Sequence, residues 1–136
     1  VQCKAVEELV RNSDIICTTT PSTTPVLPDD KELLRGKCII AIGSYMPEMR
    51  EIPDAVLDLV DNVYIELPYA CEESGDLSQP LASGKLTKDR IKLMHEYLIS
   101  GEKEIKEGQT TYFKSVGMGL FDVCIAQKLY EVAKEK

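Results

Sequence analysis

The chain has 136 residues, and 16 Lys and Arg against 23 Asp and Glu give it a formal net charge of −7. This length is typical of one domain, which buries a hydrophobic core without needing disulfides. With 43% hydrophobic and 29% charged residues, the composition is that of a globular protein rather than a disordered one. The acidic balance excludes nucleic acid as an expected partner, because phosphate binding requires clustered Lys and Arg. The longest apolar run, 38–42, is too short to span a membrane.

The five cysteines are spread along the chain, and no two have the C-x-x-C spacing of a zinc or redox site. Cys17, Cys38 and Cys124 lie in apolar runs, where a free cysteine behaves as a small hydrophobic residue. We therefore expect reduced, buried thiols and no metal site. Reduced cysteines indicate a cytoplasmic protein.

The first half of the chain alternates short helices with apolar strands. An amphipathic helix over 5–12 comes first. The predicted strands are 14–18, 37–42 and 63–66, and the helices between them are 30–34 and 53–60. Strands made of consecutive apolar residues are typical of a parallel sheet covered on both faces. Strand–helix–strand units of this length predict an α/β fold with a Rossmann-like doubly wound parallel sheet.

The second half of the chain is predicted to be mainly helical. Short helical or turn segments are expected over 68–74 and 76–83, and an amphipathic helix over 89–100. A charged linker at 102–107, an extended segment at 110–115 and a helix from about 117 to 133 follow. Apolar residues cover more than half of the circumference of that last helix. It therefore needs partners on two sides, one its own domain and the other a second subunit or another part of the chain.

Polar loops follow the first two predicted strands. The hydroxyl-rich segment 18–25 begins where the first strand ends, and ligands of open parallel sheets bind at the carboxyl ends of strands. Hydroxyls there suit ribose or phosphate oxygens, although a loop without function also fits this composition. The loop after the second strand begins at Gly43, which permits close approach of a backbone. Further along this loop, Arg50 and Glu51 are candidates to recognise a carboxylate or an amine, or they form a surface ion pair.

Three further segments are candidate sites. The acidic segment 72–76 lacks the ligand spacing of a calcium loop, so we expect its glycine to end one helix and Asp76 to cap the next. His95 is the only histidine, and no nucleophile motif supports a hydrolase triad. Gly117-Met118-Gly119 does not complete a dinucleotide fingerprint. Lys114, Ser115 and the start of the last helix nevertheless favour an anion or a polar amide.

Five groups of residues occur in a characteristic order along almost the whole chain. They are Ala5-Val6-Glu7-Glu8 with Ser13-Asp14-Ile15-Ile16, Thr20-Pro21-Ser22-Thr23-Thr24-Pro25-Val26-Leu27, Ile42-Gly43-Ser44-Tyr45 with Arg50-Glu51-Ile52, Glu73-Ser74-Gly75-Asp76-Leu77, and Thr111 with Phe113-Lys114-Ser115-Val116-Gly117-Met118 and Asp122. Each group alone is a weak signal. Together they resemble the ornithine cyclodeaminase/mu-crystallin family.

The resemblance implies that residues 1–100 are part of a Rossmann NAD(P)-binding domain. Residues 101–136 would then be a linker and a C-terminal helix that returns to a substrate-binding and dimerisation domain. It implies a homodimer that uses NAD or NADP and acts on an amino acid or imine, as a cyclodeaminase, an amino-acid dehydrogenase or a ketimine reductase. The family's glycine-rich phosphate turn lies upstream of the matched segments. We therefore expect the 136 residues alone to be inactive.

The resemblance also implies the residues of the site. The loop after the first strand would flank the ribose and nicotinamide of the cofactor, through Thr19, Thr20, Pro21, Ser22 and Thr23. The second loop would contribute Gly43 and Ser44. The segment before the last helix would border the nicotinamide ring, through Lys114, Ser115 and Gly117. Tyr45 stands where the cyclodeaminase and alanine-dehydrogenase branches have an Asp near the substrate amine. A phenol, with an ordinary pKa of about 10, is a poor base in place of a carboxylate. This favours a ketimine reductase or another dehydrogenase, with a non-catalytic crystallin-like binding protein as the alternative.

Overall fold

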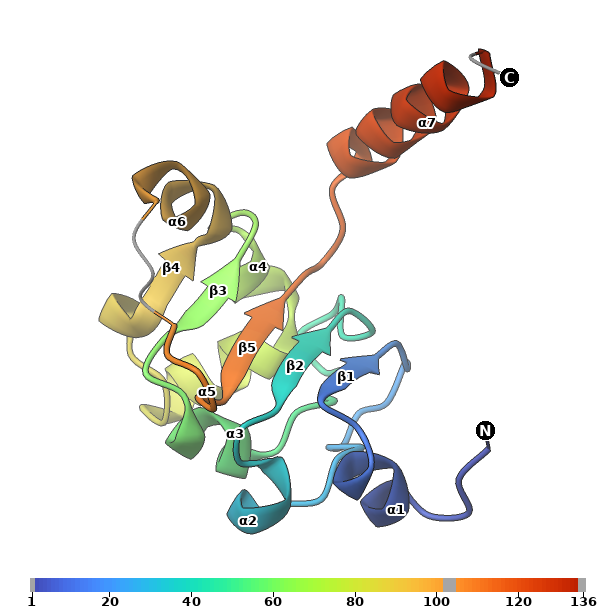
Figure 1. Cartoon of the computed structure of the whole chain (residues 1–136). Helices are drawn as coiled ribbons and strands as arrows, with labels where there is room; N and C mark the ends of the chain where they lie inside the picture. The colour runs from blue at the N-terminus through green and yellow to red at the C-terminus, as the bar shows by residue number, and fades with distance from the viewer. Residues whose placement is uncertain (1, 102–104, 135–136) are drawn as a thin grey trace.

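The described residues, 2–101 and 105–134, fold around a five-stranded sheet, shown as a computed structural model in Figure 1. In spatial order the strands are β1 (Ile15–Thr18), β2 (Cys38–Ala41), β5 (Thr111–Lys114), β3 (Val63–Ile65) and β4 (Ile91–Leu93). All neighbouring strands run parallel. The last strand in the sequence thus lies in the middle of the sheet. The predicted α/β class with a parallel sheet is confirmed.

Short helices connect the strands. They are α1 (Val6–Arg11), α2 (Lys31–Leu34), α3 (Asp54–Leu59), α4 (Ala70–Glu73), α5 (Gly75–Ser83), the 3₁₀ turn η1 (Lys88–Arg90), α6 (Met94–Ser100) and α7 (Gly119–Lys134). Two neighbouring aspartates accept hydrogen bonds from the N-terminal N–H groups of two of these helices. The Asp30 side chain accepts hydrogen bonds from the first-turn N–H groups of α2. The Asp29 carboxylate accepts from the Ala55 N–H at 2.8 Å, at the start of α3.

One face of the sheet is well buried. Ile16, Ile39, Tyr112 and Val63 are consecutive partners across four strands, and none is more than 3% exposed. Residues of α2, α3, α4 and α5 join them in one hydrophobic cluster. This row of partners holds the strand ends level and at a fixed spacing.

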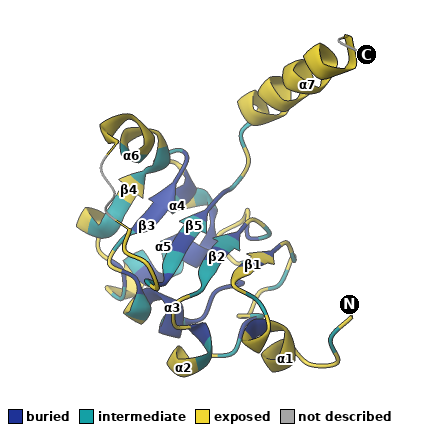
Figure 2. Ribbon diagram, viewed as in Figure 1, coloured by how far each residue is buried: buried dark blue, intermediate teal, exposed yellow. Residues whose placement is uncertain are grey.

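The opposite face is more open. Ile15 is 66% exposed and Cys17 is also exposed, whereas Cys38 and Ile40 are half-buried. The prediction that the strands are covered on both faces is therefore wrong for β1. Among the described helices, α6 lies on this face beside β3, where the rings of Tyr64 and Tyr97 pack 5.2 Å apart. The β1 end of the face is left uncovered (Figure 2).

The helix predicted over 89–100 is wrong in its first part. Residues Ile91–Leu93 form β4, which pairs with Val63–Ile65 and so satisfies its backbone through the sheet. Arg90 anchors the preceding turn, because its guanidinium donates to the carbonyls of Leu57 and Val60 at 2.6 Å and of Asp61 at 3.1 Å. The apolar spacing of this segment comes from an edge strand followed at once by a helix.

The C-terminal helix α7 projects away from the sheet and its other helices (Figures 1 and 2). None of its described residues is buried, and Val123 and Leu129 are 62% and 65% exposed. A helix close to the predicted bounds is thus present. The described part of the chain does not cover its apolar surface.

The cysteines depart from the sequence prediction. All five are free, as expected, but Cys17 lies on the open face of β1 and Cys124 on α7, and both are exposed. Their burial was predicted from apolar neighbours, of which Ile15, Val123 and Ile125 are themselves exposed. Part of the predicted charged linker, 102–104, lies outside the described residues. Within the described residues, no helix combines the length and the apolar character needed to cross a membrane.

Candidate functional site

The carboxyl ends of the five strands lie level with one another. Thr18, Ala41, Lys114, Ile65 and Leu93 are successive partners across the sheet. At this edge the chain leaves β1, β2 and β5 into the segments 19–23, 43–45 and 115–117. The structure therefore brings all three predicted cofactor loops to the same edge of the sheet, as expected for ligand sites of parallel sheets.

A buried carboxylate joins the first two loops. Oε1 of Glu51 accepts from the backbone N–H of Thr20 at 2.5 Å and from its hydroxyl at 2.8 Å. Oε2 accepts from the Thr18 hydroxyl at 2.9 Å and from the Gly43 N–H at 2.8 Å. Glu51 is fully buried, so the predictions that it contacts a substrate or forms a surface ion pair are both wrong. Its charge is used within the protein instead.

Gly43 lies in close contact with the loop that follows β1. A Cβ at this position would come within 2.2 Å of the backbone N and O of Thr20 and within 2.6 Å of Glu51 Oε1. No side chain fits there without separating the two loops. The predicted close approach at Gly43 is therefore real, and the backbone that approaches belongs to the neighbouring loop.

A second buried carboxylate supports Glu51 from behind. Asp76 is 2% exposed, and its Oδ1 accepts from the backbone N–H groups of Glu51 and Ile52 at 2.7 and 2.9 Å. The predicted helix cap at Asp76 is wrong, because the Ser74 hydroxyl caps α5 by accepting from the Asp76 N–H at 3.2 Å. Gly75 is the first residue of α5 rather than the end of the preceding helix.

Lys114 is fully buried beneath this edge. Its Nζ lies 3.7 Å from Asp76 Oδ2 and donates to the Ala41 carbonyl at 3.3 Å. Burial lowers the pKa of Lys114 and raises the pKa of Asp76. The alternation of β5 turns the Lys114 side chain toward the helix-covered face, and its implied contact with the nicotinamide ring stays a prediction. Lys114 balances the charge of Asp76.

A third carboxylate holds the loop after β5. Glu66, which follows β3 and is 5% exposed, accepts through Oε1 from the Ser115 hydroxyl at 2.8 Å. The same oxygen accepts from the N–H groups of Val116 and Gly117 at 2.7 and 3.1 Å. Sequence reasoning missed Glu66. The signal for it was an acidic residue directly after a buried strand.

The other predicted residues differ in their exposure. Thr19, Pro21, Thr23, Tyr45 and Gly117 are exposed, and Thr20, Ser22 and Gly43 are half-buried. Ser44 is buried, donates from its hydroxyl to the Met49 carbonyl and hydrogen-bonds the Ser74 hydroxyl, both at 2.8 Å. The exposed residues are thus the ones free to meet a ligand, and the buried ones shape the loops.

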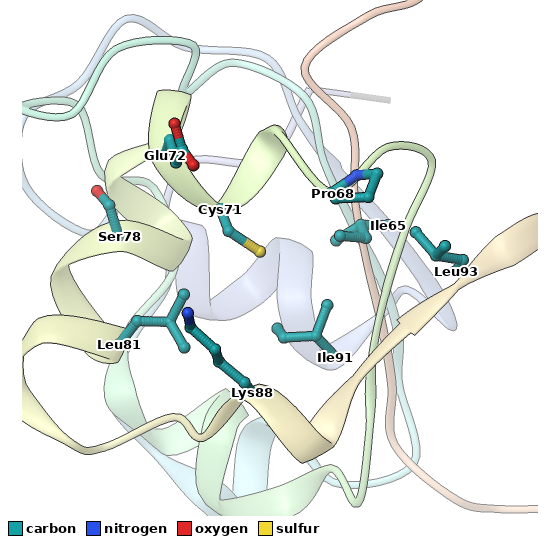
Figure 3. A pocket seen from close by; sticks show the side chains of 9 residues that line it. All are labelled: Ile65, Pro68, Cys71, Glu72, Ser78, Leu81, Lys88, Ile91 and Leu93. Atoms are coloured by element: carbon teal, nitrogen blue, oxygen red, sulfur yellow. The ribbon is translucent and has the colours of Figure 1, made fainter.

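A separate cavity of about 620 Å³ lies beside β3 and β4 and next to α4 and α5 (Figure 3). The Cys71 thiol points into it toward Ile65 and Ile91, and burial raises the pKa of this thiol. None of the predicted site residues lines this cavity. Across the described part of the chain, no cluster of three His, Cys, Asp or Glu is suited to hold a metal.

A level edge with three polar loops is shared by many nucleotide-binding folds, so similarity to known proteins decides the family. The family model of the ornithine cyclodeaminase/mu-crystallin family matches residues 1–136. The chain belongs to this family. The resemblance found in the sequence is thereby confirmed.

Named members of the ornithine cyclodeaminase/mu-crystallin family are similar over most of the chain. Delta(1)-pyrroline-2-carboxylate reductase of Bacillus cereus is 38% identical over 136 residues, covering 98% of this chain and 41% of the relative. Ketimine reductase mu-crystallin of Mus musculus is 33% identical over 129 residues, covering 95% of this chain and 39% of the relative. The chain thus spans about two fifths of the length of these relatives.

The fold matches that of a solved structure. The structure of Thermococcus litoralis Delta(1)-pyrroline-2-carboxylate reductase in complex with NADH and L-proline has a TM-score of 0.80 to this chain at 24% identity. The match covers 98% of this chain and 42% of that one. At this identity the comparison establishes the common fold.

Proposed function

We propose that this chain is part of the NAD(P)-binding region of an oxidoreductase that acts on the carbon–nitrogen bond of an amino acid or imine. The observation that carries the proposal is the set of three loops at one edge of a parallel sheet, held by buried carboxylates, in a chain of this family. Such an edge is where open α/β sheets bind nucleotides.

The exposed residues of the edge fit a nicotinamide dinucleotide. Thr19 and Thr23 offer hydroxyls that suit ribose oxygens. Around Gly117 there is open space, since a Cβ built there meets no atom within 4 Å. A nicotinamide cofactor, when bound, supplies the hydride exchange. The chain's own residues orient the cofactor and exclude water from one side of it. The sequence of these loops supports NAD and NADP equally.

Reduction of an imine is the direction that we propose. Tyr45, 50% exposed after β2, stands in place of the acidic residue that the resemblance associates with ornithine cyclisation. The relatives from Bacillus cereus and Mus musculus are named as reductases of cyclic imines or ketimines. We propose a cyclic imine carboxylate as the substrate class.

We further propose that the complete protein is a homodimer in which α7 packs outside the sheet domain. Its exposed apolar residues support this assignment. The five free cysteines agree with a cytoplasmic location.

The test uses the complete protein, titrated with NADH and NADPH while nicotinamide fluorescence is followed. We expect the protein to bind at least one of the two cofactors and to oxidise it when Δ1-pyrroline-2-carboxylate is added. Binding without oxidation by cyclic or open-chain imines would favour the crystallin-like binding protein. Failure to bind either cofactor would overturn the proposal.

A further inference from the structure

We propose that Glu51 is a positioning residue that fixes the spacing of two cofactor loops and so sets dinucleotide affinity without touching the cofactor. The inference rests on the proposed NAD(P)-dependent function. Neither the family match nor the names of the relatives assign a role to this residue.

The carboxylate of Glu51 is a cross-link between the exits of two neighbouring strands. Its two oxygens accept four hydrogen bonds: one from Thr18 at the end of β1, two from Thr20 in the loop that follows, and one from Gly43 after β2. The backbone of Glu51 belongs to the same junction, because its carbonyl accepts from the Val26 N–H at 2.8 Å. Rigid placement of these loops fixes where the exposed residues Thr19 and Tyr45 stand.

The cross-link is itself held in place from the core. Asp76 accepts from the Glu51 N–H at 2.7 Å, and Lys114 lies 3.7 Å from the second oxygen of Asp76. Burying two carboxylates and one ammonium costs desolvation energy, and apolar residues of similar volume often serve stability equally well. A fully satisfied carboxylate at this point therefore provides directional bonds, which apolar packing does not.

The amide of glutamine cannot replace this carboxylate. Glu51→Gln turns one acceptor oxygen into an NH₂ group, and in either amide orientation this group faces a backbone N–H, that of Thr20 or that of Gly43. That hydrogen bond is lost and two donors are brought together, whereas the threonine hydroxyl on the same side can turn and accept from the NH₂ group. Gly43→Ala reaches the same junction independently, since its Cβ would lie 2.2 Å from the backbone of Thr20. Thr18→Val removes a single hydrogen bond to Glu51 with little change of shape.

The experiment measures the dissociation constants of NADH and NADPH, the cofactor KM, kcat at saturating cofactor, and Tm in the complete protein. We expect Glu51→Gln to raise Kd and KM about tenfold, with kcat changed by no more than about twofold. Gly43→Ala, which forces the two loops apart, should raise Kd and KM at least as much. Thr18→Val should raise Kd by about two- to threefold. Its milder effect keeps the test informative should Glu51→Gln fold poorly.

Two controls separate positioning from stability. Glu48→Gln makes the same chemical change at an exposed glutamate in the same loop, and should leave Kd unchanged. Leu57→Ala truncates a core residue of α3 that is 2% exposed, and should lower Tm without changing Kd. The inference is overturned if Thr18→Val and Glu51→Gln bind the cofactor as wild type does, or if Leu57→Ala weakens binding equally. A wild-type protein that binds neither cofactor would instead overturn the proposed function.

Discussion

Four charged side chains lie buried beneath the carboxyl edge of the sheet: Glu51, Glu66, Asp76 and Lys114. Buried carboxylates are tolerated where several N–H and O–H groups donate to them. Glu51 meets this condition at both oxygens, through loop backbone and hydroxyl donors. Glu66 and Asp76 meet it at one oxygen each, and the Lys114 ammonium lies 3.7 Å from the second oxygen of Asp76. Loop geometry at this edge thus depends on directional hydrogen bonds to carboxyl groups rather than on apolar packing alone.

Lys114 provides a test of this charge balance. Lys114→Met leaves Asp76 buried without its cation, and we expect the free energy of unfolding of the complete protein to fall by about 3 kcal/mol. The Lys114→Met/Asp76→Asn double variant removes both charges and should recover part of the loss. Urea unfolding of the wild type, both single variants and the double variant measures the coupling. A double variant no more stable than Lys114→Met would contradict the pairing.

At the scale of elements, helix α5 starts against the loop that carries Glu51. A Cβ on Gly75 would come within 2.1 Å of the Met49 carbonyl and 2.5 Å of the Pro47 carbonyl. Gly75→Ala should therefore destabilise the protein by about 1–3 kcal/mol. Gly84→Ala is not a matched control, because Gly84 has a positive φ of 76°. Ser83→Ala lies at an exposed position in the same helix and should lower the stability measured by thermal unfolding less than Gly75→Ala does.

Helix α7 is the element whose environment differs most from its sequence. Its apolar residues are exposed in this chain, and the proposed homodimer covers them in the complete protein. We expect Val123→Glu with Leu129→Glu to reduce the molar mass measured by light scattering to about half, because buried apolar surface drives such interfaces. Lys128→Gln, on the same helix, should leave the mass unchanged. An unchanged mass in the double variant would exclude α7 from the interface.

At the scale of the whole molecule, burial couples the Asp76 carboxyl to stability. Its pKa is raised above 3.8 in the folded protein, chiefly by desolvation and against two backbone hydrogen bonds. The folded state thus holds this proton more tightly than the unfolded chain. The resulting stabilisation is complete below pH 3.8 and is lost as pH rises through the folded pKa.

Unfolding measured against pH provides the test. Relative to Asp76→Asn, the wild type should lose free energy of unfolding as pH rises above 3.8. Asp58 has the opposite shift, because Lys31 and Lys85 lower its pKa, so its contribution is present above 3.8 and lost as pH falls. The difference between wild type and Asp58→Asn should therefore change in the opposite direction. If the free energy of unfolding changed with pH in the same way for wild type and Asp76→Asn, burial would not raise the pKa of this carboxyl.

Several elements could be predicted from residues close together in the sequence. The strands β1, β2, β3 and β5 and the helix α7 follow from runs or periodic spacings of apolar residues. The site loops followed from their position after strands. Strand β4 could not be predicted this way, since its three residues also fit a helical period and only the edge of β3 makes them a strand.

The sequence by itself thus determined the class of fold, the family and the three loops of the edge, because these depend on local pattern and order. The tertiary structure decided the place of β5 between β2 and β3, and it placed the buried Lys114 ammonium beside Asp76. It also made Glu51 a buried cross-link instead of a surface charge. These features arise from contacts between residues far apart in the chain. Such contacts outweigh the local secondary-structure propensity of each segment, and they produce no periodic pattern in the sequence.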